Sequence, residues 1–349
     1  MINEELDNRL KYLRGLQTYD FTDYNDIIRL HLNESPFSPS ERVIKRIVEV
    51  AREGNRYPNP ERVEMFKVLA GRYCGVKSEN VIPTPGGDGA IRLIVNNLLR
   101  RGEKAVVNFP SYSMYSVYSS VKELRLTKVN LIEENYTWRA DTDALVNSVR
   151  DAKVTFIDDP NNPTGAKIFG GKEEEIREIL ETTNGLVVVD EAYHEFAGYS
   201  VTRLVDKYDN LIVIRTFSKA FGMAGFRVGY LVTNENITNA LRKATTPFDV
   251  SAPSLEGAIE ALLDPSYALE NATIISKIRS NFTEKLRRAG FKVYDSVTNF
   301  ILIKDARDLK SLLFSHGIAI RRVNDGLYRI SIGTNEQIEK VEDVLLNSI

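Results

Sequence analysis

The 349-residue sequence has only one cysteine, Cys74, and almost no net charge. A single cysteine cannot form a disulfide within the chain, which fits a reducing compartment. The 46 basic and 48 acidic side chains give a formal charge of -2, and no block of basic residues stands out as a surface for a polyanion. We therefore expect no nucleic-acid partner.

The sequence also lacks long apolar runs. No stretch approaches the roughly 20 apolar residues that a membrane-crossing helix needs. Residues 1–15 mix acids and bases where a secretory signal would have an apolar core. These absences predict a cytoplasmic protein with no membrane partner. What remains, 43% hydrophobic and 27% charged residues, is typical of a folded globular chain.

Between about residues 80 and 232, short apolar runs alternate with helical segments. The runs are β-branched and apolar throughout, as in strands covered on both faces, which favours a sheet with much parallel pairing. The predicted strands are 105–108, 154–157, 186–189, 211–215 and 228–232, and the predicted helices are 41–53, 65–73, 89–99 and 173–181. This alternation predicts a layered α/β domain.

After Pro247 the pattern changes to that of a smaller α+β domain. Its predicted elements are a long polar helix at 267–289, strands at 291–294, 300–303 and 328–332, and helices at 308–316 and 336–346. The first forty-odd residues, with prolines at 36 and 39, are expected to be irregular. We predict an N-terminal arm (1–45) that packs with the small domain (249–349), and a large domain between them (46–248).

Ligands bind beyond the carboxyl ends of the strands in open α/β sheets, so the polar residues that follow each run are candidates for a site. Lys219 follows the strand 211–215 among small and apolar neighbours, where desolvation would lower its pKa and make it an amine nucleophile. Arg227 can meet a phosphate bidentately, and Thr216 and Ser218 offer hydroxyls to the same anion. A Ser-Lys pair alone would more often belong to a solvated loop.

Asp190 ends the apolar strand 186–189, where a carboxylate is costly unless it meets a positive partner. A protonated pyridinium nitrogen is such a partner. Tyr193, three residues later, can reach a phenolic oxygen on the same ligand. The simpler alternative is that Asp190 caps a helix that begins near Ala192.

Two loops complete the set of candidate segments. In FIDDPNNPTG, residues 156–165, two prolines fix the backbone, so that Asn162 can donate its amide from a rigid position, although the segment alone would suit a simple turn. In residues 84–99, glycines lead into a helix whose first N–H groups are unpaired and therefore suit a phosphate. The residues expected to line that anion site are Gly86, Gly87, Asp88 and Gly89.

Together these segments resemble those of fold-type I aminotransferases, which depend on pyridoxal 5'-phosphate (PLP). The motifs SKAF…AGFRVGY, PNNPTG and DEAY are highly specific for that superfamily, and the match runs in order from about residue 30 to 335. LNESPF, RYPNP, FPSYSMYSV, GIAIR and YRISIGT add a resemblance to the histidinol-phosphate aminotransferases. The resemblance implies a three-layer large domain with a mostly parallel mixed sheet, plus a smaller α+β domain.

The resemblance also implies the role of each site residue. Lys219 would hold PLP covalently, Asp190 would bind its ring nitrogen, and Asn162 and Tyr193 would hold its phenolic oxygen. Tyr112 would stack on the ring. The phosphate of PLP would be bound by Tyr57 from the other subunit of a homodimer and by residues of the same subunit: Thr216, Ser218, Arg227, Gly87, Asp88 and Gly89. The family often has an acidic residue where Gly89 stands.

On the substrate side, the resemblance implies that Arg329 binds a carboxylate and Arg321 a substrate phosphate, with the adjacent Arg322 as the alternative. Tyr19 and Asn33 would also face the substrate. The implied reaction transfers an amino group between L-histidinol phosphate and 2-oxoglutarate in histidine biosynthesis, giving imidazole acetol phosphate and glutamate, with no metal ion.

Three alternatives remain open from the sequence. Two keep the same chemistry: an aromatic amino-acid aminotransferase and a PLP-dependent decarboxylase of a phosphorylated amino acid. The third belongs to another class, a non-catalytic PLP-binding regulator. The presence of Lys219, Asp190, Asn162 and Tyr193, without an appended DNA-binding segment, argues against that third function.

Overall fold

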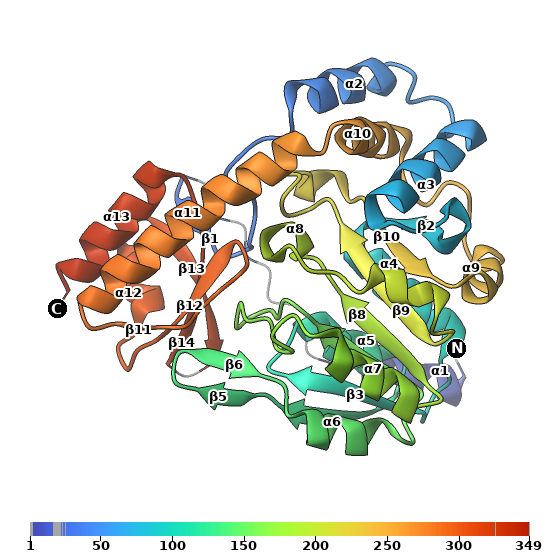
Figure 1. The fold of residues 1–349 in the computed structure, drawn as a ribbon, viewed down its shortest axis with the longest axis horizontal. Helices are drawn as coiled ribbons and strands as arrows, with labels where there is room; N and C mark the ends of the chain where they lie inside the picture. The colour runs from blue at the N-terminus through green and yellow to red at the C-terminus, as the bar shows by residue number, and fades with distance from the viewer. Residues whose placement is uncertain (1–2, 17–21, 23, 25, 325, 349) are drawn as a thin grey trace.

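The structure, a computed structural model, describes residues 3–16, 22, 24, 26–324 and 326–348. Its elements gather around a large and a small sheet (Figure 1). The strands of the large sheet, from one edge to the other, are β2 (Val81–Thr84), β10 (Gly229–Thr233), β9 (Leu211–Thr216), β8 (Leu186–Asp190), β7 (Val154–Asp158), β3 (Lys104–Phe109) and β4 (Arg125–Asn130). β10 is antiparallel to both of its neighbours, and the other pairs are parallel. The predicted mostly parallel mixed sheet is confirmed.

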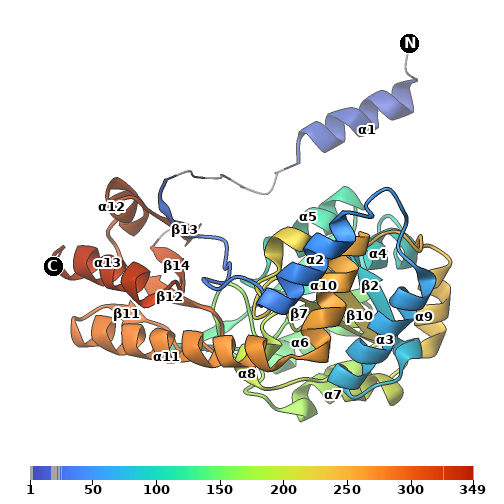
Figure 2. The same cartoon turned by 90° about the horizontal axis from the view of Figure 1, so that it is seen from above.

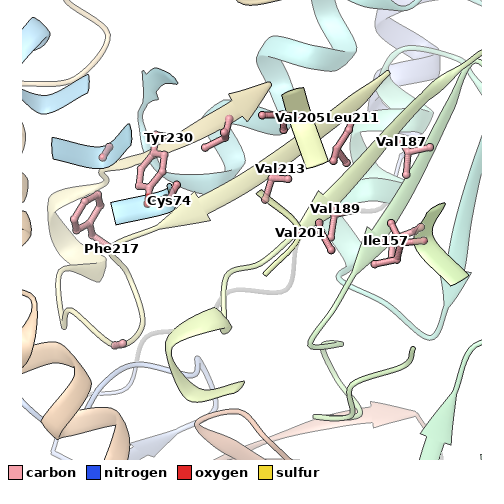
Figure 3. Close-up of a cluster of buried hydrophobic side chains, with 14 of the residues drawn as sticks. Cys74, Ile157, Val187, Val189, Val201, Val205, Leu211, Val213, Phe217 and Tyr230 are labelled. Carbon is pink, nitrogen blue, oxygen red and sulfur yellow. Dashed lines mark hydrogen bonds between the residues drawn. The ribbon is translucent and has the colours of Figure 1, made fainter. Parts of the chain in front are cut away.

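Side chains of the large sheet alternate between two buried faces. Val187, Val189 and Val213 belong to one apolar cluster, which Figure 3 shows in close-up, while Val188 and Ile212 belong to a second cluster on the opposite face. Because successive side chains point to opposite faces and both faces are covered, most positions of the central strands β7, β8 and β9 are apolar. This burial explains the continuous apolar runs in the sequence.

Helices cover both faces of this sheet and complete the three predicted layers. The helices around it are α2 (Glu41–Ala51), α3 (Pro60–Cys74), α4 (Gly86–Leu98), α5 (Ser113–Val121), α6 (Thr142–Val149), α7 (Glu173–Thr182), α8 (His194–Ala197), α9 (Glu235–Arg242) and α10 (Ala252–Leu263). α3, α6, α7 and α10 contribute to the first cluster, and α4, α5 and α9 to the second. A ribbon of β5 (Ile132–Glu134) and β6 (Thr137–Arg139) lies beside the small sheet (Figure 1).

The small sheet has five strands in the order β1 (Ile28–Leu30), β13 (Ile318–Asn324), β14 (Leu327–Ser331), β12 (Phe300–Lys304) and β11 (Lys292–Val293). It packs with α11 (Ser266–Arg288), α12 (Leu309–Ser315) and α13 (Asn335–Leu346), which confirms the smaller α+β part. β1 comes from the N-terminal arm and runs parallel to β13, with Ile28 opposite Ile318. Among the described residues, none of the helices has the length and apolar character to cross a membrane.

The expectation that the first forty-odd residues are irregular is wrong for α1 (Glu4–Arg14). Asn3 caps this helix through Leu6 N–H at 2.9 Å, and its first turn is acidic while its last turn is basic, which suits the helix dipole. Leu6, Leu10 and Leu13 recur at helical spacing, but none of the residues of α1 is buried within this chain. Figure 2 shows α1 outside the helix layers, and the Tyr12 hydroxyl donates to Ser120 O at 2.6 Å.

The position of α10 bears on where the large domain ends. α10 follows the expected boundary near residue 248, yet it packs against α2 and α3, as Figure 2 also shows. Its Glu256 accepts hydrogen bonds from Arg46 Nε at 3.0 Å and Arg62 Nε at 2.5 Å. We therefore propose that α10 belongs to the large domain and that the small domain begins with α11.

A buried ion pair joins the ends of β8 and β9. Arg215 Nε lies 2.7 Å from Glu191 Oε2, and the two side chains are 3% and 0% exposed. Glu191 Oε1 also accepts a hydrogen bond from Val201 N–H at 2.6 Å. The carboxylate therefore compensates a guanidinium that water does not reach.

The substitution Glu191→Ala should lower the free energy of unfolding by about 3–5 kcal/mol, because it leaves Arg215 buried without a counter-charge. Urea denaturation followed by circular dichroism measures this loss. The control is Glu284→Ala, which removes a largely exposed partner of Arg288 on α11 and should change stability by less than about 1 kcal/mol. Equal losses in the two variants would contradict the prediction.

Candidate active site

A cavity of about 570 Å³ lies at the carboxyl ends of the parallel strands. β7, β8 and β9 end at Asp158, Asp190 and Thr216, and all three residues line it. Asn33 from the N-terminal arm and Arg329 from β14 close the cavity from the side of the small sheet. It therefore lies where ligands bind in open α/β sheets, and it draws on both parts of the chain.

Lys219 reaches the cavity from the turn that follows β9. Its Nζ lies 3.3 Å from Leu32 O and 3.2 Å from Asn33 O. Burial, and to a smaller extent the charge of Arg329, lower the pKa of Lys219 to about 8. A much larger share of this amine is therefore neutral at neutral pH than for a solvated lysine, as a nucleophile requires.

Asp190 lies in the same cavity and is nearly buried. The Tyr115 hydroxyl donates to its Oδ2 at 2.8 Å, and Ala192 N–H donates to its Oδ1 at 3.0 Å. Burial raises the pKa of Asp190 to about 6, while the hydrogen bond from Tyr115 lowers it. The alternative that Asp190 caps a helix near Ala192 is wrong, because α8 begins at His194 and has Tyr193 as its N-cap with no side-chain cap. The position of Asp190 in the cavity wall lets it face a cationic ligand.

A set of polar groups at the start of α4 and after β9 suits a phosphate. Arg227 Nη2 lies 3.2 Å from Asp88 Oδ2, and Arg227 Nη1 lies 3.5 Å from Ser218 Oγ. Gly86 has a φ of 72°, a conformation that favours glycine, and a Cβ there would lie 2.8 Å from Arg227 Nη2, so that the guanidinium would have to move. Gly87 lines the cavity with them.

Gly89 has a different position from the other predicted phosphate residues. It is buried in the first turn of α4, and a Cβ there would lie 2.6 Å from the Pro85 ring. The glycine is therefore needed for packing of the turn. This local crowding gives a physical reason why an acidic side chain is absent here.

Asn162 and Tyr193 present polar groups from the opposite side of the cavity. Arg329 Nη1 donates to Asn162 Oδ1 at 2.6 Å, which leaves the Asn162 amide hydrogens to serve as donors. Arg329 Nη2 donates to His31 O at 2.7 Å. Asn33 Nδ2 donates to the Tyr193 hydroxyl at 2.9 Å, so that this hydroxyl proton can point elsewhere.

Tyr112 also lines the cavity, and its hydroxyl donates to Asp88 Oδ1 at 3.0 Å. Tyr57, in contrast, is 76% exposed and stacks on Phe248 with ring centroids 4.3 Å apart. The structure therefore places Tyr112 at the site and Tyr57 on the surface of this chain. Tyr19 lies outside the described residues.

Arg321 lies in register with Arg329, where β13 pairs with β14. Directly opposite like charges destabilise an antiparallel pair unless an anion compensates them. Arg322 is in register with Tyr328, and successive side chains alternate between faces. Arg321 therefore shares the face of Arg329, whereas Arg322 points to the other face.

Two residues at the site received no role from the sequence. Tyr115 binds Asp190 and stacks on Phe156, with ring centroids 5.1 Å apart. Asp158 accepts hydrogen bonds from four N–H groups around the cavity. The available signal for Asp158 was that it ends an apolar strand, as Asp190 does.

The cavity fits PLP in its chemistry. Lys219 offers an amine to the aldehyde, Asp190 a carboxylate to the ring nitrogen, and Asn162 an amide donor to the phenolic oxygen. Arg227 and the N-terminus of α4 offer positive charge and N–H groups to the phosphate. Each polar part of the cofactor thus has, in one cavity, a partner of opposite charge or a complementary hydrogen-bonding group.

Comparison with known proteins agrees with this chemistry. Residues 25–345 match the family model for aminotransferase class I and II. Histidinol-phosphate aminotransferase from Sulfurisphaera tokodaii is 47% identical over 94% of this chain and 92% of its own length. The enzyme of the same name from Thermoanaerobacter pseudethanolicus is 36% identical over 97% of this chain and 96% of its own length.

A similar solved structure is that of histidinol-phosphate aminotransferase from Sinorhizobium meliloti in complex with PLP. It is 27% identical to this chain, has a TM-score of 0.82, and the match covers 92% of this chain and 90% of that one. The similarity therefore extends over both sheets and the cavity between them.

The substitution Tyr115→Phe should shift the pH dependence of PLP binding. The Tyr115 hydroxyl lowers the pKa of Asp190, so its removal raises that pKa above about 6. Asp190 then becomes protonated at a higher pH, and PLP affinity should begin to fall at a higher pH as the solution is acidified. Absorbance titrations of PLP binding at several pH values measure this shift.

Tyr118→Phe is the matched control, because Tyr118 lies on the same helix and lines the same cavity, while the hydroxyl bound to Asp190 is that of Tyr115. This variant should lose PLP affinity at the same acidic pH as the wild type. If Tyr115→Phe also lost PLP affinity at the same acidic pH as the wild type, the Tyr115 hydroxyl would not control the pKa of Asp190.

Proposed function

Because the chain belongs to the aminotransferase class I and II family, we propose that it transfers an amino group between L-histidinol phosphate and 2-oxoglutarate. The products are imidazole acetol phosphate and glutamate. The observation that carries the proposal is that Lys219 and Asp190 line one cavity together with Arg329. The 47% identical relative of nearly equal length supports this choice of amine.

When bound, PLP supplies an aldehyde that reacts with amines and a ring that accepts electron density. Asp190 keeps a proton on the ring nitrogen, since its carboxylate is buried and attracts positive charge. Asn162 and Tyr193 hold the phenolic oxygen. Lys219 Nζ, with its lowered pKa, would move the proton between the substrate α-carbon and C4' of the cofactor.

The two substrates bring different anions to the site, where Arg329 lines the cavity and Arg321 lies opposite it on β13. Arg329 is 7% exposed, and Asn162 and the His31 carbonyl hold its guanidinium, so that it suits the carboxylate of glutamate or 2-oxoglutarate. Arg321 suits the phosphate of histidinol phosphate, because it lies opposite Arg329 on the same face of the small sheet. We assign the phosphate to Arg321 and not to Arg322 on this register.

A homodimer is part of the proposal. The stacked pair of Tyr57 and Phe248 is exposed, at 76% and 46%, which suits an aromatic contact with a second copy of the chain. In that dimer, Tyr57 reaches the phosphate of the partner's PLP. The single buried cysteine, Cys74, fits a cytoplasmic location.

Lys219→Ala should lower the rate of transamination at least about 10²–10⁴-fold, because it removes the group that moves the proton. Borohydride reduction of this variant should leave no cofactor covalently bound. Lys207→Ala, which changes an exposed lysine in the same part of the chain, is the control and should keep both the rate and the reducible link. Wild-type turnover in Lys219→Ala would refute the assigned role.

Arg321→Ala should lower kcat/KM for histidinol phosphate about 10- to 100-fold, since it removes a charged hydrogen-bond partner of the substrate phosphate. The effect on glutamate should be far smaller. Arg322→Ala, one residue along β13 on the opposite face, is the matched control. Steady-state kinetics with each amine give the comparison, and an equal loss for the two amines would contradict the assignment to Arg321.

The same kinetics should include phenylalanine and an assay for carbon dioxide. Preference for phenylalanine over histidinol phosphate would identify an aromatic aminotransferase, and release of carbon dioxide would identify a decarboxylase. Either result would overturn the proposed substrate while leaving the proposed role of Lys219 intact.

A further inference from the structure

Asp158 is a buried carboxylate at the edge of the proposed cofactor site. It ends β7 in register with Asp190 at the end of β8, and it is 3% exposed. In-register residues of parallel strands project to the same face, so the two carboxylates share one edge of the sheet. Yet the proposed chemistry uses only Asp190 directly.

Four N–H groups converge on the Asp158 carboxylate. Oδ1 accepts from Asn108 Nδ2 and Asn161 Nδ2, each at 2.9 Å. Oδ2 accepts from the backbone N–H of Tyr112 at 3.1 Å and of Asn162 at 3.0 Å. A set made of N–H donors matches an ionised carboxylate, because a protonated acid would bring a hydroxyl that needs an acceptor.

Two features of the environment of Asp158 act in opposite directions on its ionised form: burial disfavours it, and hydrogen bonds favour it. Burial raises the pKa of Asp158 to about 7, while the hydrogen bonds from Asn108 and from the Asn162 backbone lower it. A positive ring nitrogen bound next to Asp190 favours the ionised form further. The geometry of the four donors is therefore best satisfied when the cofactor is in place.

The two backbone N–H groups on Oδ2 belong to loops that carry predicted contacts to the cofactor. Tyr112 begins the turn into α5 after β3, and Asn162 lies in the turn after β7. These loops are 50 residues apart in the sequence, and a single carboxylate oxygen holds both. Asn161, on the other oxygen, also donates to Pro110 O at 3.0 Å and so fastens the same two loops together.

We propose that Asp158 is a positioning residue of the PLP site, whose carboxylate fixes the backbone of Tyr112 and Asn162 relative to each other. The ring of Tyr112 and the amide of Asn162 then approach the cofactor from fixed directions. This proposal rests on the proposed cofactor site. Asp158 acts through these two residues and not on the reacting atoms.

Asp158→Ala removes the acceptor for all four N–H groups and should raise the PLP dissociation constant at least about tenfold, because several hydrogen bonds to a charged group are lost. The dissociation constant is measured by fluorescence on reconstitution, with no amine substrate present. The visible circular dichroism of bound PLP should also change, since this signal reports how the ring is held.

Asp158→Asn distinguishes the loss of the hydrogen bonds to the backbone of Tyr112 and Asn162 from the effect of removing a buried side chain. The new carbonyl oxygen can keep both backbone N–H groups, while the new amide no longer accepts from Asn161 Nδ2. The side chain of Asn108 can turn its Oδ1, which is buried and has no hydrogen-bond partner within the described part of the chain, toward the new amide. This variant should recover most of the PLP affinity that Asp158→Ala loses. Affinity as weak as that of the alanine variant would overturn the anchoring role.

The neighbouring Asp159 provides a matched control. It is also a fully buried carboxylate, and its Oδ1 accepts from Ile168 N–H at 2.9 Å on the side away from the cavity. Asp159→Ala should lower the melting temperature while leaving the PLP dissociation constant close to that of the wild type. If Asp159→Ala weakened PLP as much as Asp158→Ala, or if Asp158→Ala bound PLP like the wild type, the proposal would be overturned.

These outcomes are distinct from a failure of the proposed function. A wild-type protein that binds PLP but does not transaminate histidinol phosphate would refute the proposed substrate, and the comparison of Asp158 with Asp159 variants would still decide the positioning role.

Discussion

The site depends on the parallel pairing of β7, β8 and β9, because parallel strands bring their carboxyl ends to a single edge of the sheet. Asp158 and Asp190 end two of these strands, and Lys219 follows the third after a short turn. Asp158 and Lys219, which are 61 positions apart in the sequence, thus meet in one cavity. The apolar strands hold this edge in place by burying both faces of the sheet.

Burial gives these polar groups their chemistry. In water Lys219 would be cationic at neutral pH and Asp190 anionic well below it. Desolvation lowers the pKa of the amine to about 8 and raises that of the acid to about 6. A larger fraction of the amine is thereby neutral and able to react. The acid stays ionised at neutral pH, and its electrostatic interactions are stronger in the buried site than in water. Because burial removes Asp190 from water, its carboxylate needs the hydrogen bond that the Tyr115 hydroxyl donates.

The N-terminal arm is part of the site as well as of the small sheet. β1 pairs with β13, and Leu32 and Asn33, shortly after β1, accept hydrogen bonds from Lys219 Nζ through their carbonyl oxygens. Asn33 has a positive φ of 55° and binds the Tyr193 hydroxyl through its side chain. One segment therefore connects the small sheet, the amine and a predicted cofactor contact, so that a change in the packing of the arm reaches the reacting groups.

The sequence by itself predicted the layers of the large domain, because short β-branched apolar runs that alternate with helical segments favour buried strands. It also predicted most of the residues that line the cavity, because specific motifs follow those runs. It did not reveal α1, none of whose residues is buried within this chain, nor the roles of Tyr115 and Asp158. Those roles arise from contacts between residues 46 to 75 positions apart, such as Tyr112 with Asp158 and Tyr115 with Asp190. The choice between Arg321 and Arg322 likewise required the strand register, since adjacent residues on a strand differ only in the face to which they point.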